Sequence, residues 1–267
     1  MEYFMTSDKK YLQAVAILMG MLNIGASATF AGQPLETETA RLPKQGHGNA
    51  QAVYEYQWSG AGRESAVPLA FEYGILNRLE IAVEPVIHTS IRPKTGPSAT
   101  GFGDTEVTLT YLLANETRRY PAFAIASEIK FPTTHDPLIG TGGTDFRIVG
   151  IASKRLGPLD LHANLGYTVV GTGSIGAYGN NFDVIDYAVA AEYDLAPMVA
   201  LVTEVLGTVS AGGGESTPGA AQEAAGTTLT GLLGGAYRPG SRLECALGFT
   251  YDDAHATLAR AAFTFKF

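Results

Sequence analysis

Apolar and polar residues alternate along most of the chain beyond residue 50, and the clearest case is its C-terminal end. Phe263, Phe265 and Phe267 alternate there with small or polar residues. A period of two places the three aromatic rings on one face of a strand. An open aromatic edge strand promotes aggregation, whereas the last strand of a membrane barrel pairs with the first and turns one face to lipid. The pattern favours a membrane barrel, with the terminal strand of a soluble β-protein as the alternative.

Eleven earlier segments repeat this alternation, which gives twelve predicted strands in total. Each is about ten residues long, the length that crosses a bilayer at a tilt. The alternation is weakest around residues 146–155, where Ile148 and Val149 are both apolar. The earlier segments run near residues 54–58, 67–73, 79–84, 106–111, 123–130, 146–155, 159–169, 185–194, 199–205, 228–238 and 242–251.

The connections between these segments fall into two classes. Every second connection is a short turn, at residues 74–77, 115–118, 156–158, 196–197 and 239–240. The connections between them include long, glycine-rich loops at residues 90–103, 132–144, 171–181 and 210–226. Short periplasmic turns and longer extracellular loops are typical of outer-membrane barrels. The sequence therefore predicts an all-β protein, a closed antiparallel transmembrane β-barrel of about twelve strands over residues 51–267.

The N-terminal segment has the features of an export signal. Lys9 and Lys10 precede a short apolar stretch, and Ala26-Ser-Ala28 is a small-residue cleavage site, with Thr29-Phe-Ala31 as a second possibility. Residues 1–31 are predicted to be a cleavable signal peptide, with a buried helix or a retained anchor as the alternative. Residues 32–50 lack apolar periodicity and are predicted to be a flexible periplasmic lead-in or a short plug. Export and the terminal strand predict an outer-membrane location, reached with the help of the barrel-assembly machinery.

Composition narrows the classes of function. Charged residues make up 16% of the chain, against roughly 25% in average soluble domains. The net charge of −8 gives no basic surface for nucleic acid. The single cysteine, Cys245, forms neither an intrachain disulfide nor a zinc site. The expected partners are outer-membrane lipid and small-molecule solutes, and we expect no cofactor, no metal and no nucleic acid.

Three stretches carry a resemblance to a known family. Gly101-Phe-Gly-Asp104 opens a strand, Glu128-Ile-Lys-Phe-Pro-Thr-Thr134 closes another, and Gly140-Thr-Gly-Gly-Thr-Asp145 follows. Together with the terminal aromatic strand, they resemble the outer-membrane proteins of the family named for the MetA pathway of phenol degradation. The resemblance covers roughly residues 50–267. It implies an outer-membrane barrel that acts as a channel for small aromatic or apolar compounds, and it carries over no binding residue.

If the apolar faces look outward, charged residues line the lumen. Such a lumen is predicted to be a polar pore for the passive diffusion of small solutes, and its carboxylate excess favours cations. The alternatives are a lumen sealed by ion pairs, which suits a structural barrel, and an adhesive surface protein that presents its loops. The lumen-lining candidates are Glu72, Glu84, Glu106, Glu128, Lys130, Arg147, Arg155, His162, Asp186, Glu192, Glu204, Arg242, Glu244 and Arg260.

An enzymatic role is not expected, although a barrel esterase or acylase is the remaining alternative. Such an enzyme needs a serine activated by a histidine base near the lipid interface. His162 and Ser153 form the one obvious pair, and His162 points inward, away from acyl chains. The stretch Gly171-Thr-Gly-Ser-Ile-Gly176 matches a dinucleotide-binding pattern but opens no predicted helix, so we interpret it as a glycine-rich loop. No catalytic residue is predicted.

Overall fold

The computed structural model describes residues 35–171, 183–211 and 228–267. These residues form thirteen strands and no helix. Among them, no helix is long and apolar enough to cross a membrane. The predicted signal peptide, residues 1–31, lies outside the described residues. The strands are β1 (Gly48–Trp58), β2 (Gly62–Leu76), β3 (Leu79–Pro93), β4 (Ala99–Gly101), β5 (Thr105–Ala114), β6 (Ala122–Phe131), β7 (Asp145–Leu156), β8 (Leu159–Val169), β9 (Val184–Ala196), β10 (Val199–Ser210), β11 (Thr228–Tyr237), β12 (Leu243–Asp252) and β13 (Thr257–Lys266).

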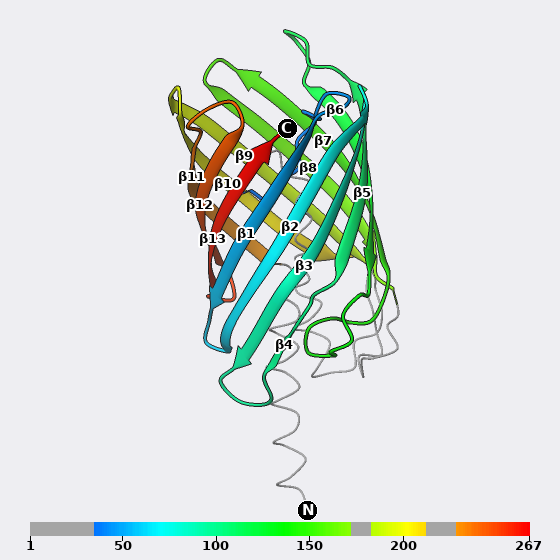
Figure 1. Ribbon diagram of the computed structural model, residues 1–267, viewed down its shortest axis with the longest axis vertical. Helices are drawn as coiled ribbons and strands as arrows, with labels where there is room; N and C mark the ends of the chain where they lie inside the picture. The colour runs from blue at the N-terminus through cyan, green and yellow to red at the C-terminus, as the bar shows by residue number, and fades with distance from the viewer. Residues whose placement is uncertain (1–34, 172–182, 212–227) are drawn as a thin grey trace, which may run out of the picture.

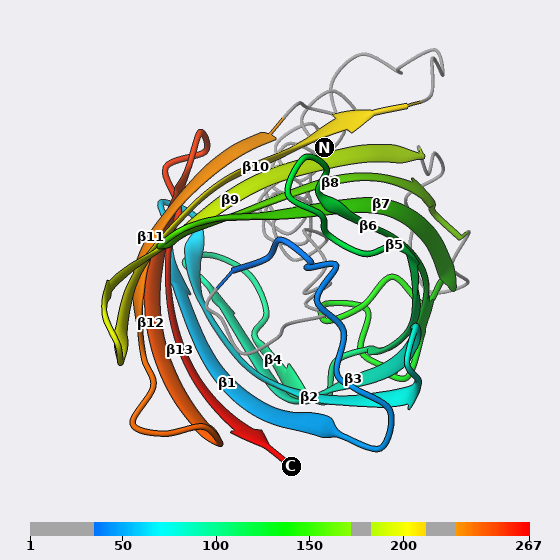
Figure 2. The ribbon, with the colours of Figure 1, turned by 90° about the horizontal axis from the view of Figure 1, so that it is seen from above.

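Twelve of the described strands close into one antiparallel ring (Figures 1 and 2). Neighbours in sequence pair from β5 to β13, β13 pairs with β1, and β2 joins β1 to β3. The ring closes between β3 and β5, because β4 is a three-residue strand that pairs only with β3. The predicted closed barrel of twelve strands is confirmed.

The first and last strands pair as the terminal aromatic pattern predicted. Tyr54 is the register partner of Ala261, and Asn49 is the partner of Lys266. Beyond the last strand, Phe267 and Gly48 exchange two backbone hydrogen bonds of 2.9 Å each. The pairing extends past the predicted start of the barrel at residue 51, because β1 already begins at Gly48.

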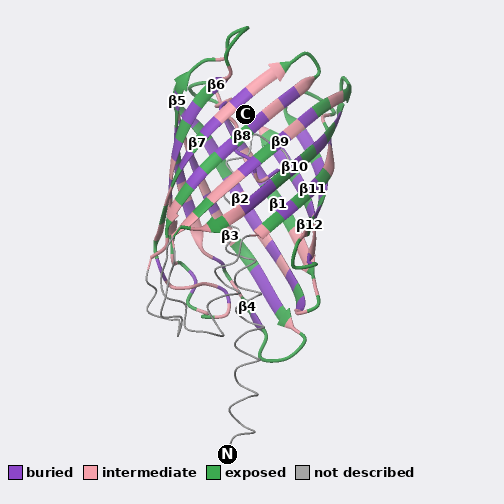
Figure 3. Cartoon of the chain, turned by 180° about the vertical axis from the view of Figure 1, so that it is seen from behind, coloured by how far each residue is buried: buried purple, intermediate pink, exposed green. Residues whose placement is uncertain are grey.

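Burial alternates residue by residue along the strands, which gives the banded pattern in Figure 3. In β13, Phe263 is 49% exposed and Phe265 is 40% exposed, whereas Thr264 between them is 1% exposed. The large apolar side chains therefore point out of the barrel, and the small or polar ones point into it. Cys245 is exposed on the outer face. A surface of this kind suits lipid, because its large side chains are apolar and each of the twelve strands of the ring pairs with a neighbour on both sides.

In strand β7 the alternation of apolar and polar residues is interrupted, and the structure gives the reason. Val149 is fully buried and Ile151 is 3% exposed, so both apolar side chains point inward. They pack in one buried cluster with Ala40, and Leu42 lies against it. The interior therefore contains an apolar surface where residues from before the first strand are packed.

The two ends of the barrel differ in their connections. We call the end with the short turns between β2 and β3, β7 and β8, and β9 and β10 the turn end, and the opposite end the loop end. At the loop end, Ile91, Ala99 and Ile139 form a buried apolar cluster, against which Ala61 and Leu138 pack. Because Ile139 belongs to the connection between β6 and β7, that loop folds back onto β3 and β4.

Candidate functional site

Residues 35–47, which we call the plug segment, enter the barrel interior. In Figure 2 the dark blue chain before β1 winds through the ring. Its exposed end lies at the turn end, where Gly46 and His47 form backbone hydrogen bonds with Gly74 of 2.9 and 3.0 Å. Leu35 is fully buried, and Glu38 is 1% exposed. The sequence left two predictions for this segment, a flexible periplasmic lead-in or a short plug, and the position of residues 35–47 agrees with the plug, because the inward side chains of the barrel supply their hydrogen-bond partners.

Between residues 36 and 40, side chains of the barrel wall hold the backbone of the plug segment. Asn164 on β8 makes two bonds to Glu38: its Oδ1 accepts from the backbone N–H at 2.5 Å, and its Nδ2 donates to the carbonyl at 3.0 Å. The N–H of Ala40 donates to Ser153 Oγ on β7 at 2.9 Å. Every second backbone N–H from residue 36 to residue 40 therefore finds a side-chain acceptor, since Glu204 accepts from Glu36 at 3.0 Å. An extended chain inside a barrel needs such partners, because an unpaired buried N–H is costly.

Arg147 on β7 joins the plug segment to the barrel wall. Its guanidinium contacts Glu38 at 2.9 Å and Glu128 on β6 at 3.2 Å. It also forms a two-pronged pair with Asp186 on β9, at 2.5 and 3.1 Å. One buried guanidinium is thereby surrounded by three carboxylates, which is the arrangement in which a buried charge is well compensated.

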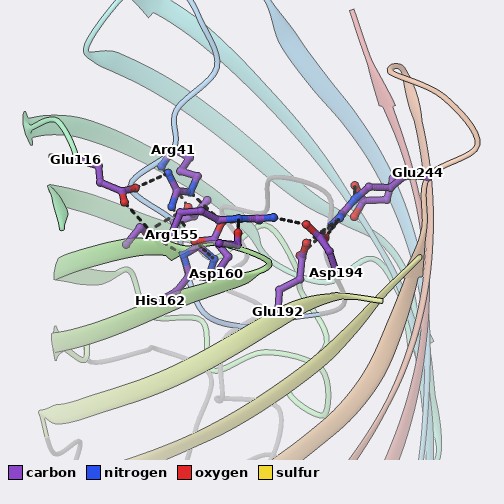
Figure 4. Close-up of polar contacts among 12 residues, drawn as sticks. Arg41, Glu116, Arg155, Asp160, His162, Glu192, Asp194 and Glu244 are labelled. Atoms are coloured by element: carbon purple, nitrogen blue, oxygen red, sulfur yellow. Dashed lines mark hydrogen bonds and ion pairs between the residues drawn. The ribbon is translucent and has the colours of Figure 1, made fainter. Parts of the chain in front are cut away.

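A second charged cluster lies nearer the turn end (Figure 4). Arg41 of the plug segment pairs with Asp160 on β8 at 3.0 and 2.7 Å, and with Glu116 in the turn between β5 and β6 at 2.9 Å. Arg155 on β7 pairs with Asp160 at 3.5 Å and with Asp194 on β9. The plug segment therefore contributes a basic residue to an ion-pair network that crosses from β5 to β9.

Arg238, in the turn after β11, extends the network along the barrel wall. It pairs with Glu192 through two bonds, 2.7 and 2.9 Å long, and its Nε donates to Glu244 at 3.0 Å. Glu192 and Glu244, both labelled in Figure 4, therefore share one guanidinium. Lys266 also reaches Glu244, at 3.4 Å. The shared guanidinium joins β9 to β12, two strands that are not neighbours in the ring.

Arg260 on β13 holds the start of the plug segment. It pairs with Glu36 and with Glu55 on β1, the latter with a hydrogen bond of 2.8 Å. Burial raises the pKa of Glu36 to about 7, because desolvation of its carboxylate outweighs the attraction of Arg260. The carboxyl groups of Glu55 and Glu204 lie close enough to raise it further. Arg260 therefore joins the start of the plug segment to β1 and β13 through a carboxyl group whose pKa is raised by burial.

The wall formed by β2, β3 and β5 differs from the rest of the lumen. Glu72, Glu80, Glu84 and Glu106 are at most 9% exposed, and no basic residue in the described structure forms an ion pair with any of them. We call these four residues the acidic wall. Glu72 accepts a hydrogen bond from Asn49 at 2.7 Å. A buried carboxylate with no cationic partner needs water, a proton or a bound cation. The acidic wall is thus a part of the lumen whose buried carboxyl groups have no ion-pair partner among the described residues.

The predicted lumen-lining residues fall in three groups. Glu72, Glu84 and Glu106 belong to the acidic wall. Nine others lie in strands, are buried or half-buried, and contribute to the paired clusters: Glu128, Lys130, Arg147, Arg155, His162, Asp186, Glu192, Glu204 and Glu244. Lys130 pairs with Asp145. Arg260, which is 4% exposed, belongs to the same group through its pairs with Glu36 and Glu55. Arg242 does not fit the prediction, because it is exposed in the turn before β12.

The structure brings Ser153 and His162 together, as an esterase would require, but covers the serine. Ser153 Oγ lies 2.9 Å from His162 Nδ1, and His162 Nε2 lies 3.9 Å from Asp160 Oδ1. Ser153 is 0% exposed, and its Oγ accepts the hydrogen bond from Ala40 and lies 3.3 Å from Thr39 Oγ1. These contacts hold the plug segment in place and leave the hydroxyl no access to an acyl substrate. No group of three or more His, Cys, Asp or Glu side chains in the described residues is arranged to hold a metal ion.

Several residues of the site were not among the candidates. Glu36, Glu38 and Arg41 belong to a segment without periodicity, and Asn164 is an uncharged residue whose two bonds to Glu38 became evident only in the structure. The one signal in the sequence for the plug segment lies on β7. Its inward apolar residues, Val149 and Ile151, require an apolar partner inside the barrel.

The closed ring, apolar exterior and charged interior define an outer-membrane β-barrel protein. A sequence model of the family described as "Putative MetA-pathway of phenol degradation" matches residues 33–267, and the chain belongs to this family. No curated protein matches it by sequence. The chain is similar in structure to the COG4313 outer membrane channel from Pseudomonas putida F1, with a TM-score of 0.68 and 13% identity over 85% of this chain and 97% of that one. It is also similar to the KdgM porin in complex with disordered oligogalacturonate, with a TM-score of 0.56 and 8% identity over 82% of this chain and 99% of that one. At these identities the similarity establishes the fold.

Proposed function

We propose that this protein is an outer-membrane channel for the passive diffusion of small solutes. The observation that carries the proposal is the acidic wall. Four buried carboxylates without ion-pair partners are costly in a dry lumen, so the side of the barrel formed by β2, β3 and β5 is expected to contain water. A hydrated strip beside the plug segment is a route for solutes that are small enough. The two similar structures whose names include channel and porin support this function.

The solute class is a finer part of the same proposal. The family description refers to phenol degradation, which makes small aromatic compounds the candidate solutes. Beside the plug segment, the acidic wall presents carboxyl groups that can accept a hydrogen bond from a phenolic hydroxyl, which suits compounds with both a ring and a hydroxyl group. The covered hydroxyl of Ser153 supports a channel and not a hydrolase.

Liposome swelling tests this function. Vesicles that contain the purified barrel are expected to swell in isotonic solutions of small neutral polyols, at a rate that falls steeply with solute size because the plug segment narrows the lumen. Vesicles without protein give the baseline. Parallel runs with an aromatic and an aliphatic polyol of equal mass test the solute class, and equal rates would count against the aromatic preference. Swelling no faster than the baseline would favour a structural barrel with a sealed lumen.

A further inference from the structure

Two carboxylates of the acidic wall face each other directly. Glu84 on β3 and Glu106 on β5 are register partners, and both point into the barrel. Glu84 is 5% exposed and Glu106 is 9% exposed. Directly opposed residues on antiparallel strands have Cβ atoms about 4.5–5.5 Å apart, and like charges there are destabilising. The pair therefore needs a positive charge or a shared proton between its two members.

The neighbouring basic residues are already paired. Lys130 on β6 is the register partner of Glu106, but its Nζ pairs with Asp145. Arg147, one strand further, pairs with the three carboxylates of Glu38, Glu128 and Asp186. Within the described part of the chain, neither Glu84 nor Glu106 forms an ion pair.

Three oxygen atoms around this pair are buried and have no hydrogen-bond partner. They are Oε2 of Glu84, Oε2 of Glu106 and Oγ1 of Thr108. Thr108 is 1% exposed and follows Glu106 by two residues, so its side chain lies on the same inward face of β5. Buried polar atoms are nearly always satisfied in native proteins, so three unsatisfied oxygens at adjacent inward positions require an explanation such as a bound ion.

We propose that Glu84, Glu106 and Thr108 bind a hydrated divalent cation of the Mg²⁺ or Ca²⁺ type inside the lumen. Both ions prefer oxygen ligands, and Mg²⁺ in particular is commonly held by one or two carboxylates while water fills its other positions. The two carboxylates balance the charge of the ion, and the threonine hydroxyl supplies a third oxygen. The proposal requires no solute transport, so it can hold or fail independently of the proposed function.

Calorimetric titration of the folded, full-length barrel in detergent with Ca²⁺, and separately with Mg²⁺, tests this site. We expect saturable binding of one ion per barrel. Glu106→Gln and Glu84→Gln should each weaken it by about tenfold or more, because each removes one of two charged ligands. Glu64→Gln is the matched control: Glu64 is a buried carboxylate of the same region, 6% exposed and with both oxygens unpartnered, but it lies outside the pair. It should change the affinity by less than about twofold.

Heat-modifiable migration on gels verifies that each variant forms a folded barrel. If one glutamate variant fails to fold, the other and Thr108→Val, which removes only the hydroxyl, provide the comparison. Absence of saturable binding by the parent barrel would overturn the proposal. It would mean that Glu84 and Glu106 share a proton instead of a metal ion. Equal weakening by Glu64→Gln and Glu106→Gln would also overturn it, because the effect would then be a general one of lumen charge. Liposome swelling of the same preparations tests the channel function separately, so that failure of the cation site can be distinguished from failure of the channel function.

Discussion

Deletion of residues 35–41 is expected to raise the single-channel conductance of the barrel severalfold. This stretch occupies the interior and is held there by side chains of the wall, among them Asn164 and Ser153. The closed ring of strands does not include it, because β1 begins at Gly48 and pairs with β13 and β2. Removing the stretch therefore widens the lumen and leaves the barrel intact. Planar-bilayer recording of the variant beside the full chain measures the change.

The control for this deletion changes the plug segment without moving it. Lys44→Ala and Gln45→Ala alter two exposed residues at the turn end, and both should conduct like the parent. A deletion variant that folds but conducts no more than the parent would show that the plug segment is not the constriction. The loops at the other end of the barrel would then be the next candidates.

Substitution Arg147→Met is expected to cause the largest loss of stability of any single change in the lumen. It leaves Glu38, Glu128 and Asp186 close together without their shared cation. Removing one partner of a buried ion pair costs about 3–5 kcal/mol. The temperature at which the barrel unfolds on heat-modifiability gels should fall clearly, and urea unfolding in detergent gives the free energy.

The matched control is Arg63→Met, which removes an arginine from the exposed face of β2. It should change stability by less than about 1 kcal/mol. Arg147→Lys should lie between the two, since it keeps the charge but loses the two-pronged geometry. In a background of Arg147→Met, the further change Glu38→Gln should recover part of the loss, because it removes one of the three repelling carboxylates. Equal effects of the substitutions at positions 63 and 147 would contradict the central role of the Arg147 cluster.

The barrel itself could be predicted from the sequence because two simple rules determine it. A period of two separates the face of a strand that meets lipid from the face that meets the lumen, as with Phe263 and Thr264. A closed ring with short turns then places each strand beside its neighbours in sequence, and the last beside the first. The closure between β13 and β1 follows from these rules alone.

The plug segment could not be predicted in this way. Its backbone bonds go to side chains that are more than a hundred residues away in sequence, such as Asn164 and Glu204. An extended chain held by side chains has no periodicity of its own. The ion-pair partners could not be predicted from the sequence either, because the stagger of the strands determines which inward side chains are in contact. Arg242 shows the same limit at a strand boundary, where a shift of one or two residues moves a side chain from the lumen to an exposed turn.

The structure gives Glu204 a second role besides lining the lumen, because this residue also holds the plug segment. Its two carboxylate oxygens accept hydrogen bonds from the backbone of Glu36 and the hydroxyl of Thr37. Neutralising this residue would loosen the plug segment as well as remove a charge. Under the proposed channel function, the residues of the acidic wall are therefore the better choice for testing an effect of charge on solutes.

The measurement that tests the channel function most directly is the reversal potential of the purified, full-length barrel in a planar bilayer under a salt gradient. We expect a small, steady conductance with a reversal potential that indicates preference for cations, because the acidic wall presents carboxylates without ion-pair partners on the side of the lumen that we propose to be hydrated. The preference should weaken as salt is raised, since screening shortens the reach of the carboxylates. A folded barrel that passes no current, or one that prefers anions, would contradict the proposed cation-preferring channel.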